Sequence, residues 1–507
     1  MASSLDGTAF ELPRLRVSYK FDDDTKLLSP DEEDLEHMVP EFFDVKFCPY
    51  QPLDQDAVFA AVSKKHVIIC RLSHNTGDKN PCSVITVIRD DDVEALNCCC
   101  TWTQDPDTGD PWLCVGGIDA RVKIYNVVTG EPVETFIGHG RDVNDLVTSP
   151  IDPLIIASAS DDASVRIWSL HSAHKKMPCL AILAGEGHHG GLLSVDFHDT
   201  GRYIISGSHD HHINLWTLPD LPESPVDTPI QVHYPHFSTS AVHNDIVDCV
   251  QFYGDRILSR ACRDKAIILW EIEGFSSKGP PPSPSLAPVP TYIQARTVDA
   301  AASQLTRSAF MTAFSPSPVP YTKLASFETP NCSTQFFMRF KLHKVPGQNH
   351  VLGFCNAGGS ILFWDLKRLE VYNEVLSDIN DPDRDRSKPL RLPTWLKQVV
   401  PRAKPDALNR FRNALSDNVS QISMQSGNSD KSSREGSEVK GQLSQETLES
   451  WAGKYSLADA ATPLKAHKAE SSNKNIVGRQ TAWSPGGDWC VVVGSSNSLM
   501  VLQRWVK

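Results

Sequence analysis

The chain has 507 residues, 40% of them hydrophobic, and a formal net charge of −13 at pH 7. No apolar run approaches the roughly 18 residues of a membrane-spanning helix, and the N-terminus lacks the basic start and apolar stretch of a secretory signal. The acidic balance argues against strong direct binding to nucleic acid, whose backbone attracts Lys and Arg. We therefore expect an intracellular protein without a membrane partner, and its charge suits basic partners.

The first element expected along the chain is a strand, LRVSYKF (15–21), in which apolar and polar residues alternate. Residues 1–14 before it are expected to be flexible. The strand stands ahead of a repeat that fills most of the chain, and its role follows from that repeat.

Two segments, 138–170 and 187–218, share one pattern. Each reads Gly-His, an apolar strand, a turn, an apolar run that ends in small residues, an Asp in a tight turn and a strand that closes on Trp168 or Trp216. This is the pattern of a four-stranded propeller blade with GH and WD signatures. The closing strand recurs seven times along the chain, at 67–72, 122–127, 165–170, 213–218, 267–272, 361–366 and 500–505.

Seven closing strands predict an all-β fold, a seven-bladed WD-repeat β-propeller with long, largely disordered insertions. Residues 15–372 would hold a closing strand and blades one to six, and residues 475–507 the seventh blade. A ring of blades must close, because an open blade exposes an unpaired strand edge. The last repeat has no fourth strand after it, so residues 15–21 are predicted to pair with the C-terminal blade.

Each of the two clearest repeats also contains a histidine, an aspartate and a tryptophan. Buried polar side chains need hydrogen-bond partners, and in such blades these three pin a turn. We therefore interpret both sets as structural and predict no catalytic residues: His139, Asp161 and Trp168; His188, Asp210 and Trp216.

Thirteen cysteines occur without a CxxC pair. The run Cys98-Cys99-Cys100 cannot share one tetrahedral zinc, because consecutive strand residues diverge. We predict no metal and no cofactor.

Three segments do not fit the repeat and are expected to be insertions: 219–242, 276–330 and 373–474. The last is a low-complexity insertion whose charged and small residues offer too little apolar area to offset ordering entropy, so much of it is expected to be mobile. Residues 391–415 combine Trp, Leu and Val with Lys and Arg. Two interpretations stay open for them, a basic helix that contacts a partner and a partly ordered insertion.

The stretch QFFMRF (335–340) places Phe336 beside Phe337. In a half-buried strand adjacent side chains point to opposite faces, so one of the two would be exposed. In the first strands of blades one, two and seven, Phe43, Cys98 and Arg479 each lie four residues before an aromatic residue, and such equivalent positions share one ring around the channel. The matching positions in blades three to five are Val143 or Asn144, Gly191 or Leu192, and Ile246.

Aromatic faces clustered at a channel mouth can hold a methylated ammonium, because the ring quadrupole attracts the cation and the methyl groups fill the apolar walls. The alternative is a hydrophobic plug that packs the blades together. Position alone favours neither interpretation.

The sequence resembles the Extra sex combs family, the WD-repeat subunits of the Polycomb repressive histone methyltransferase complex. The resemblance runs through nearly all seven blades and is carried by WTQDPDTGDPWL (102–113), GHGRDVNDL (138–146), HYPHFSTSAVHNDIVDCVQFYGDRILS (233–259), FFMRF (336–340) and GRQTAW (478–483).

The resemblance implies an aromatic cage for trimethyl-lysine on repressive histone tails, and its occupancy stimulates the partner methyltransferase in gene silencing. The cage falls on Phe43, Phe336 and Phe337, and contacts with the tail fall near Asn144, Ile246 and Arg479. The implied partners are an Enhancer-of-zeste-type SET-domain methyltransferase, a Suppressor-of-zeste-type subunit and the methylated tail, all in the nucleus.

One wall departs from the family pattern. Where the family has a tyrosine, this sequence has Cys98, which has no π face. The cage is then three-sided, weaker, or completed by another residue.

Two other functions remain to be compared with a non-enzymatic reader and scaffold. A generic WD-repeat scaffold, such as a ubiquitin-ligase substrate receptor, would share the blades but would need no aromatic mouth. A propeller enzyme lacks support, since the sequence has no G-x-S-x-G motif, no P-loop and no metal-ligand cluster.

Overall fold

A computed structural model of the chain describes residues 11–21, 40–74, 80–90, 96–289, 305–310, 319–332, 334–383, 390–397, 437–439, 443–471 and 476–504. These residues form two compact units, one of residues 10–367 with 457–507 and one built from residues of the segment 368–456. None of the helices in the described ranges has the length and apolar character needed to cross a bilayer.

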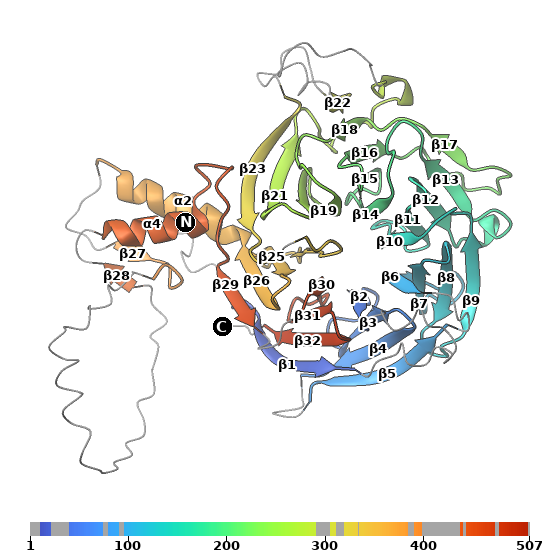
Figure 1. The fold of residues 1–507 in the computed structure, drawn as a ribbon, viewed down its shortest axis with the longest axis horizontal. Coiled ribbons are helices and arrows are strands. Elements are labelled where there is room, and N and C mark those ends of the chain that lie inside the picture. The colour runs from blue at the N-terminus through green and yellow to red at the C-terminus, as the bar shows by residue number, and fades with distance from the viewer. Residues whose placement is uncertain are drawn as a thin grey trace. The chain divides into compact units, whose positions relative to one another are not determined.

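The larger unit is a ring of seven blades around a central channel (Figure 1), as the sequence predicted, and its strand pairs are antiparallel except β13 with β17. Blades one to three are formed, from the channel outward, by β2 (Phe42–Phe47), β3 (Ala57–Ser63), β4 (His66–Leu72) and β5 (Cys82–Arg89); by β6 (Asn97–Gln104), β7 (Pro111–Gly117), β8 (Arg121–Asn126) and β9 (Pro132–Ile137); and by β10 (Val143–Thr148), β11 (Ile155–Ser160), β12 (Val165–Ser169), β13 (Cys179–Leu183) and β17 (Ile230–Val232).

Blades four to seven complete the ring. They are formed by β14 (Leu192–Phe197), β15 (Tyr203–Ser208), β16 (Ile213–Thr217), β18 (Phe237–Thr239) and β22 (Thr306–Ser308); by β19 (Val247–Tyr253), β20 (Arg256–Ala261), β21 (Ala266–Ile272) and β23 (Tyr321–Glu328); by β24 (Lys341–His343), β25 (Val351–Cys355), β26 (Ser360–Asp365) and β29 (Lys468–Ser471); and by β30 (Gly478–Trp483), β31 (Trp489–Gly494), β32 (Ser498–Gln503) and β1 (Arg14–Lys20).

The N-terminal strand closes the ring, as the sequence predicted. Strand β1 pairs antiparallel with β32 from Arg14 opposite Gln503 to Lys20 opposite Ser498. Val17 and Tyr19 pack against the core between blades one and seven. The outer edge of blade seven is therefore covered by the other end of the chain, which removes an unpaired edge.

The histidine and tryptophan of a blade share a serine hydroxyl that the sequence did not predict, and the aspartate bonds the other nitrogen of the histidine. In blade three, His139 bonds Ser158 at 2.6 Å through Nε2 and Asp162 at 2.8 Å through Nδ1, and Trp168 donates to the same Ser158 hydroxyl at 2.8 Å. The predicted partner, Asp161, was wrong by one residue. Asp161 instead accepts a hydrogen bond from Asn144, because the tight turn directs adjacent aspartates to different sides.

Blades four and five repeat this arrangement. His188 contacts Asp210 and Ser206, and His243 contacts Asp264 and Ser259, while Trp216 and Trp270 donate to the two serines at 2.9 Å. Burial lowers the pKa of all three histidines despite the neighbouring aspartates. These sets hold turns within the blades, in agreement with the structural interpretation.

The segments that do not fit the repeat contain strands. Strands β18, β23 and β29 are the fourth strands of blades four, five and six, and β17 and β22 add a fifth strand to blades three and four. The interruptions proper are therefore shorter than the ranges 219–242, 276–330 and 373–474. The sequence did not show these strands because three of them have only three residues and outer strands carry little apolar alternation.

The smaller unit contains helices α2 (Leu366–Asn380) and α4 (Gln445–Tyr455) and the strand pair β27 (Leu390–Leu392) and β28 (Ser437–Val439). Its core is aromatic, with Tyr455 packed on Tyr372 at 5.8 Å and on Trp395 at 4.9 Å between ring centroids. The low-complexity composition of the segment did not predict these helices. Of the residues 391–415 that were expected to be a basic helix or a partly ordered insertion, 398–415 lie outside the described residues.

Candidate functional site

The first strands of six blades share a β-bulge at their second residue, at one end of the channel. The register shift leaves one residue unpaired in each strand, and these residues are Phe43, Cys98, Asn144, Leu193, Asp248 and Arg479. A bulge re-aims the side chain that it carries. The positions matched by spacing, Phe43, Cys98 and Arg479, are therefore structurally equivalent. In blade five the equivalent residue is Asp248, two residues beyond Ile246, because the sequence does not reveal where a bulge shifts the register.

The stretch that carries Phe336 and Phe337 is not part of a strand. Strand β24 begins at Lys341, so the expectation that adjacent phenylalanines point to opposite faces of a strand was wrong. Phe337 instead has a φ of +59°, in the left-handed region that side chains other than glycine seldom adopt. Phe336 is 45% exposed and Phe337 is half-buried, while Phe340 is buried in the core.

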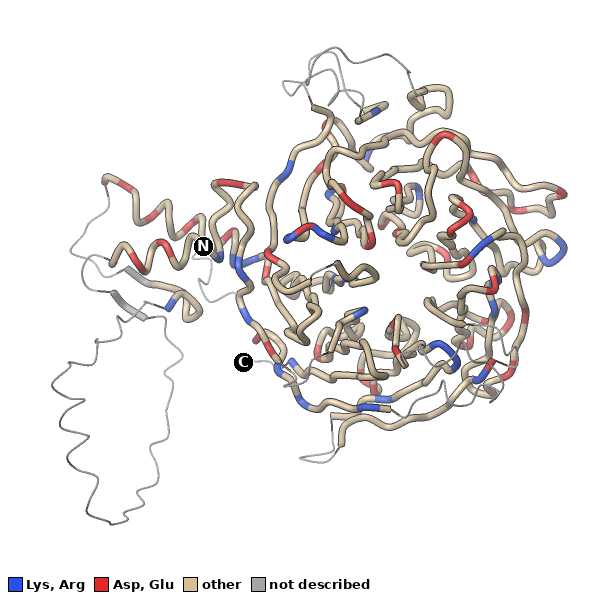
Figure 2. The backbone as a smooth tube through the Cα atoms, in the orientation of Figure 1, with Lys and Arg blue, Asp and Glu red and all other residues tan. Residues whose placement is uncertain are grey.

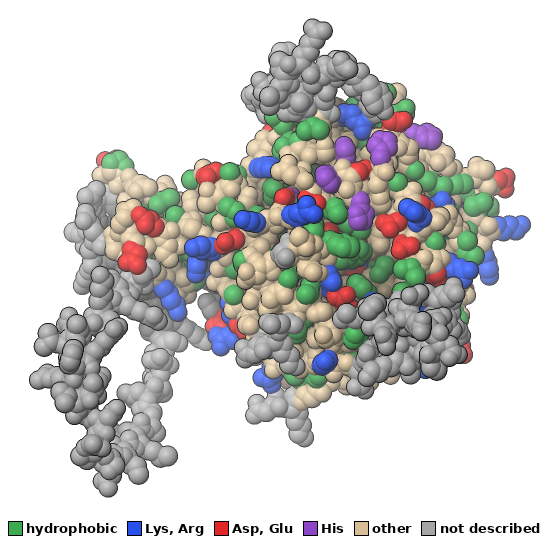
Figure 3. All heavy atoms as spheres, viewed as in Figure 1, with side chains coloured by type: hydrophobic (Ala, Val, Ile, Leu, Met, Phe, Trp, Pro, Cys, Tyr) green, Lys and Arg blue, Asp and Glu red, His purple; other side chains and the backbone are tan. Residues whose placement is uncertain are grey.

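Four rings form a row along this end of the channel, which we call the mouth. Phe43 meets Phe337 with centroids 6.4 Å apart, Phe337 meets Phe336 at 5.7 Å, and Phe336 meets His209 at 6.3 Å. The row begins in blade one and ends in blade four. Blade four carries several histidines in its loops, and Figure 3 shows histidine side chains gathered over this part of the ring. The structure thus brings together the three phenylalanines named from the sequence.

Two cations of the chain itself lie over these rings. The guanidinium of Arg339 is 5.0 Å from the centroid of Phe337, and the Lys64 ammonium is 6.0 Å from that of Phe43. Both distances are within the range of a cation–π contact. The rings of the mouth therefore have the position and the electron-rich faces that attract positive charge.

Cys98 is half-buried and uses its thiol to donate a hydrogen bond to the carbonyl oxygen of Val143 at 2.9 Å. It supplies no aromatic wall. Its neighbours Cys99 and Cys100 are buried, which raises the pKa of both thiols. No group of three metal-ligating side chains is present in the part of the chain that the structure describes.

Arg479 supports the mouth from blade seven. Its Nε donates to Glu41 at 2.6 Å and its Nη1 donates to the carbonyl oxygen of Phe336 at 2.6 Å. The side chain is therefore engaged with the backbone that carries Phe336, and it joins this backbone to the residue that precedes blade one.

Asn144 belongs to β10 of blade three, and Ile246 directly precedes β19 of blade five. Asn144 is buried, and its amide donates to Asp161 at 2.7 Å and to the carbonyl oxygen of Leu192 at 2.8 Å. Ile246 is half-buried, and its carbonyl oxygen accepts from the backbone nitrogen of Cys262 at 2.9 Å.

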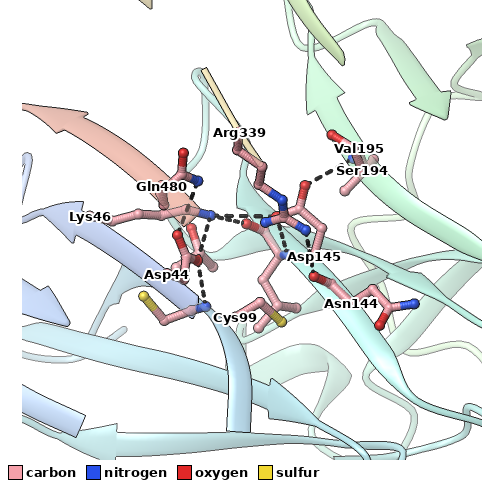
Figure 4. A network of polar contacts seen from close by, with 12 residues as sticks. Asp44, Lys46, Cys99, Asn144, Asp145, Ser194, Val195, Arg339 and Gln480 are labelled. Carbon is pink, nitrogen blue, oxygen red and sulfur yellow. Dashed lines mark hydrogen bonds and ion pairs between the residues drawn. The ribbon is translucent and has the colours of Figure 1, made fainter. Parts of the chain in front are cut away.

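A buried charge network, which the sequence did not predict, lies next to the aromatic row (Figure 4). Lys46 lies 3.6 Å from Asp44 and 3.7 Å from Asp145, and Arg339 lies 3.1 Å from Asp145. Gln480 donates to Asp44 at 3.1 Å. Figure 2 shows both signs of charge around the channel. The sequence feature that could have predicted this network is Arg339, because a charged residue within an apolar stretch must have charged partners if it is buried.

The charges in this network stabilise one another. Burial alone would raise the pKa of Asp44, but Lys46 and Arg339 lower it. Burial alone would lower the pKa of Lys46 and of Arg339, but the two aspartates raise both. Asp44, Lys46 and Arg339 are therefore charged at neutral pH.

Comparison with known proteins gives the family. A family model described as WD domain, G-beta repeat matches residues 130–169 and 177–217. The chain is 42% identical to Polycomb protein EED of Chaetomium thermophilum over 99% of its own length and 97% of that protein. The chain belongs to the Polycomb EED family. It is also 30% identical to Polycomb protein esc of Drosophila melanogaster over 51% of its length and 60% of that protein.

Solved structures of the family share the fold. The crystal structure of the Chaetomium thermophilum polycomb repressive complex 2 contains a chain 45% identical to this one, with a TM-score of 0.81 and 98% of each chain covered. A structure of that complex with H3K27me3 and H3K27M contains a chain that is 45% identical, with a TM-score of 0.82 and 99% of each chain covered. The family resemblance predicted from the sequence is thereby confirmed.

Proposed function

We propose that this EED-family chain is a non-enzymatic reader and scaffold subunit of a nuclear Polycomb histone methyltransferase complex. Its mouth binds trimethyl-lysine on a repressive histone tail, and the bound state stimulates the catalytic subunit, which supports gene silencing. The observation that carries the proposal is the contact of Phe43, Phe337 and Phe336 in one row at the mouth.

The chemistry of the row suits a trimethylated ammonium. Each aromatic face attracts the cation by about 0.5–2 kcal/mol, and the methyl groups remove apolar ring surface from water. The three phenylalanine rings supply three walls of a cage, while Cys98, at the fourth position, has no π face. The cage is therefore proposed as three-sided.

The partners follow from the family. One related structure is described as a polycomb repressive complex 2 with H3K27me3. By analogy, the partners of this chain are an Enhancer-of-zeste-type SET-domain methyltransferase, a Suppressor-of-zeste-type subunit and the methylated tail. Stimulation requires that the occupied mouth favours the active state of the methyltransferase, since a ligand with equal affinity for both states shifts nothing.

Affinity purification of the tagged full chain from nuclear extract tests the proposal. A SET-domain methyltransferase should copurify, and a trimethyl-lysine tail peptide should raise the methylation rate of the purified complex more than the unmodified peptide does. Purification without a methyltransferase, or with ubiquitin-ligase subunits instead, would favour the generic WD-repeat scaffold.

A further inference from the structure

Arg339 connects the aromatic row to the opposite side of the channel. Its guanidinium lies over the Phe337 ring at 5.0 Å. The same group donates through Nη1 to Asp145 at 3.1 Å, and through Nη2 to the carbonyl oxygens of Asn144 at 2.8 Å and Leu193 at 2.7 Å. Asn144 and Leu193 are the bulged residues of blades three and four. One side chain therefore contacts Phe337 and two other positions of the mouth.

The guanidinium has little freedom to move. Arg339 is 3% exposed and is held by one carboxylate and two carbonyl oxygens from neighbouring blades. Planar guanidinium groups that make several such bonds are fixed in orientation as well as in position. The face that Arg339 presents to Phe337 is therefore set by blades three and four.

Phe337 itself needs an external support. Its φ of +59° is an unfavourable conformation for a bulky residue and persists only where surrounding contacts impose it. On the next residue, the backbone nitrogen of Met338 donates to Asp248 at 3.2 Å. The backbone nitrogen of Arg339 donates to the carbonyl oxygen of Arg479 at 2.8 Å. These bonds fix the backbone, and in the described part of the chain one cation, the Arg339 guanidinium, lies over the Phe337 ring.

We propose that Arg339 is a positioning residue for methyl-lysine binding. Anchored to Asp145, Asn144 and Leu193, it holds the Phe337 ring at the angle in which the ring receives the ligand cation. This inference rests on the proposed function of the mouth and adds a residue that acts through Phe337. Arg339 occupies part of the Phe337 surface, so the ligand meets the ring from the remaining side.

The substitution Arg339→Met tests this role. Methionine keeps an unbranched apolar stem but loses the three hydrogen bonds. In this variant the Asp145 carboxylate still has the Lys46 ammonium as an ion-pair partner, at 3.7 Å. Without Arg339 the Phe337 ring is mobile in the free protein and loses conformational entropy when the peptide binds. This should lower the affinity for a trimethyl-lysine tail peptide about tenfold. The affinity for the unmodified peptide should change much less.

A double-mutant cycle separates positioning from general damage. In the Phe337→Ala background, Arg339→Met should lower the affinity for the trimethyl-lysine peptide by less than about twofold, because the ring that Arg339 positions is absent. The matched control is Arg504→Met, which replaces another buried arginine that bonds to Glu11 and Gln348 outside the mouth. It should leave peptide affinity unchanged even if it lowers stability.

Each outcome decides between the two claims. If the wild-type chain does not prefer the trimethylated peptide, the proposed function fails. The proposed function stands if the wild type prefers the trimethylated peptide and Phe337→Ala lowers the affinity for it. In that case two results overturn the positioning role alone: wild-type peptide affinity in Arg339→Met, or the same loss of affinity from Arg339→Met with and without Phe337→Ala. If denaturant unfolding shows that Arg339→Met does not fold, Arg339→Lys replaces it. The lysine keeps the charge without the fork of donors and should weaken binding by an intermediate factor, whereas wild-type affinity would overturn the inference.

Discussion

The rings of Phe43 and Phe337 meet edge to face with centroids 6.4 Å apart, although Phe43 belongs to blade one and Phe337 precedes blade six. Blade seven lies between these two blades in the ring. Its Arg479 bonds to Glu41 on one side and to the carbonyl oxygen of Phe336 on the other. The aromatic contact therefore depends on a closed ring, in which blade seven is completed by the N-terminal strand.

Removal of the closing strand should destabilise the propeller. Deletion of residues 1–21 takes away β1 and uncovers the edge of β32, together with the apolar contacts of Val17 and Tyr19. An uncovered edge strand is a template for intermolecular pairing, so the melting temperature should fall and aggregation should rise. Differential scanning calorimetry and light scattering measure both effects.

A shorter truncation is the control. Deletion of residues 1–10 keeps β1 and should leave the melt near that of the full chain. If the deletion of residues 1–21 melts like the shorter one, pairing of β1 with β32 contributes nothing to stability.

Cys98→Tyr should strengthen the cage. The substitution restores a ring at the bulged position of blade two, one of the positions that share the mouth with Phe43. One added cation–π face contributes about 1 kcal/mol, so affinity for the trimethyl-lysine peptide should rise about fivefold. Cys98→Ser, which keeps a donor for Val143 without adding a ring, should bind like the wild type. Equal affinities in all three proteins would show that this position does not face the ligand.

The sequence predicted the blades more reliably than the site, for a physical reason. Each closing strand buries apolar residues at regular positions, as VRIWS of β12 does with its Val, Ile and Trp, so burial leaves a repeated pattern in the sequence. The outer strands β17, β18 and β22 have three residues each and left no such pattern. These outer strands could therefore not be separated from the insertions.

At the mouth, residue type could be predicted but geometry could not. Phe336 and Phe337 were named from their sequence, yet they do not lie in a strand, since Phe337 has a φ of +59° and β24 begins only at Lys341. The choice of Asp161 over Asp162 failed at a tight turn, where one residue changes the direction of a side chain. Arg339 was missed because its partners Asp145, Asn144 and Leu193 come from blades distant in sequence.

Stability should fall as the pH drops below neutrality. His343 is buried against Trp483 and bonds to Gln348, and burial is the main cause that lowers its pKa from 6.5 to about 4. The unfolded chain then binds a proton between these two values while the folded chain does not. The contribution of neutral His343 to the free energy of unfolding is therefore fully present above pH 6.5. It falls by about 1.4 kcal/mol for each pH unit between 6.5 and 4.

His343→Gln isolates this group. The free energy of unfolding in denaturant, measured between pH 7.5 and 5, should fall less steeply in the variant than in the wild type, and the two slopes should agree above pH 7. Identical slopes throughout this range would contradict a lowered pKa at His343.

The most direct test of the account is a calorimetric titration of the wild type and of Phe337→Ala with a trimethyl-lysine histone-tail peptide, beside denaturant unfolding of both proteins. If the ring reads the methylated ammonium, its loss removes about 1–2 kcal/mol of binding, and affinity falls roughly ten- to thirtyfold while the fold stays intact. If Phe337 is instead a hydrophobic plug, the substitution costs roughly 3–5 kcal/mol of stability. Unchanged peptide affinity in a folded Phe337→Ala variant would contradict the reading of methyl-lysine at this mouth.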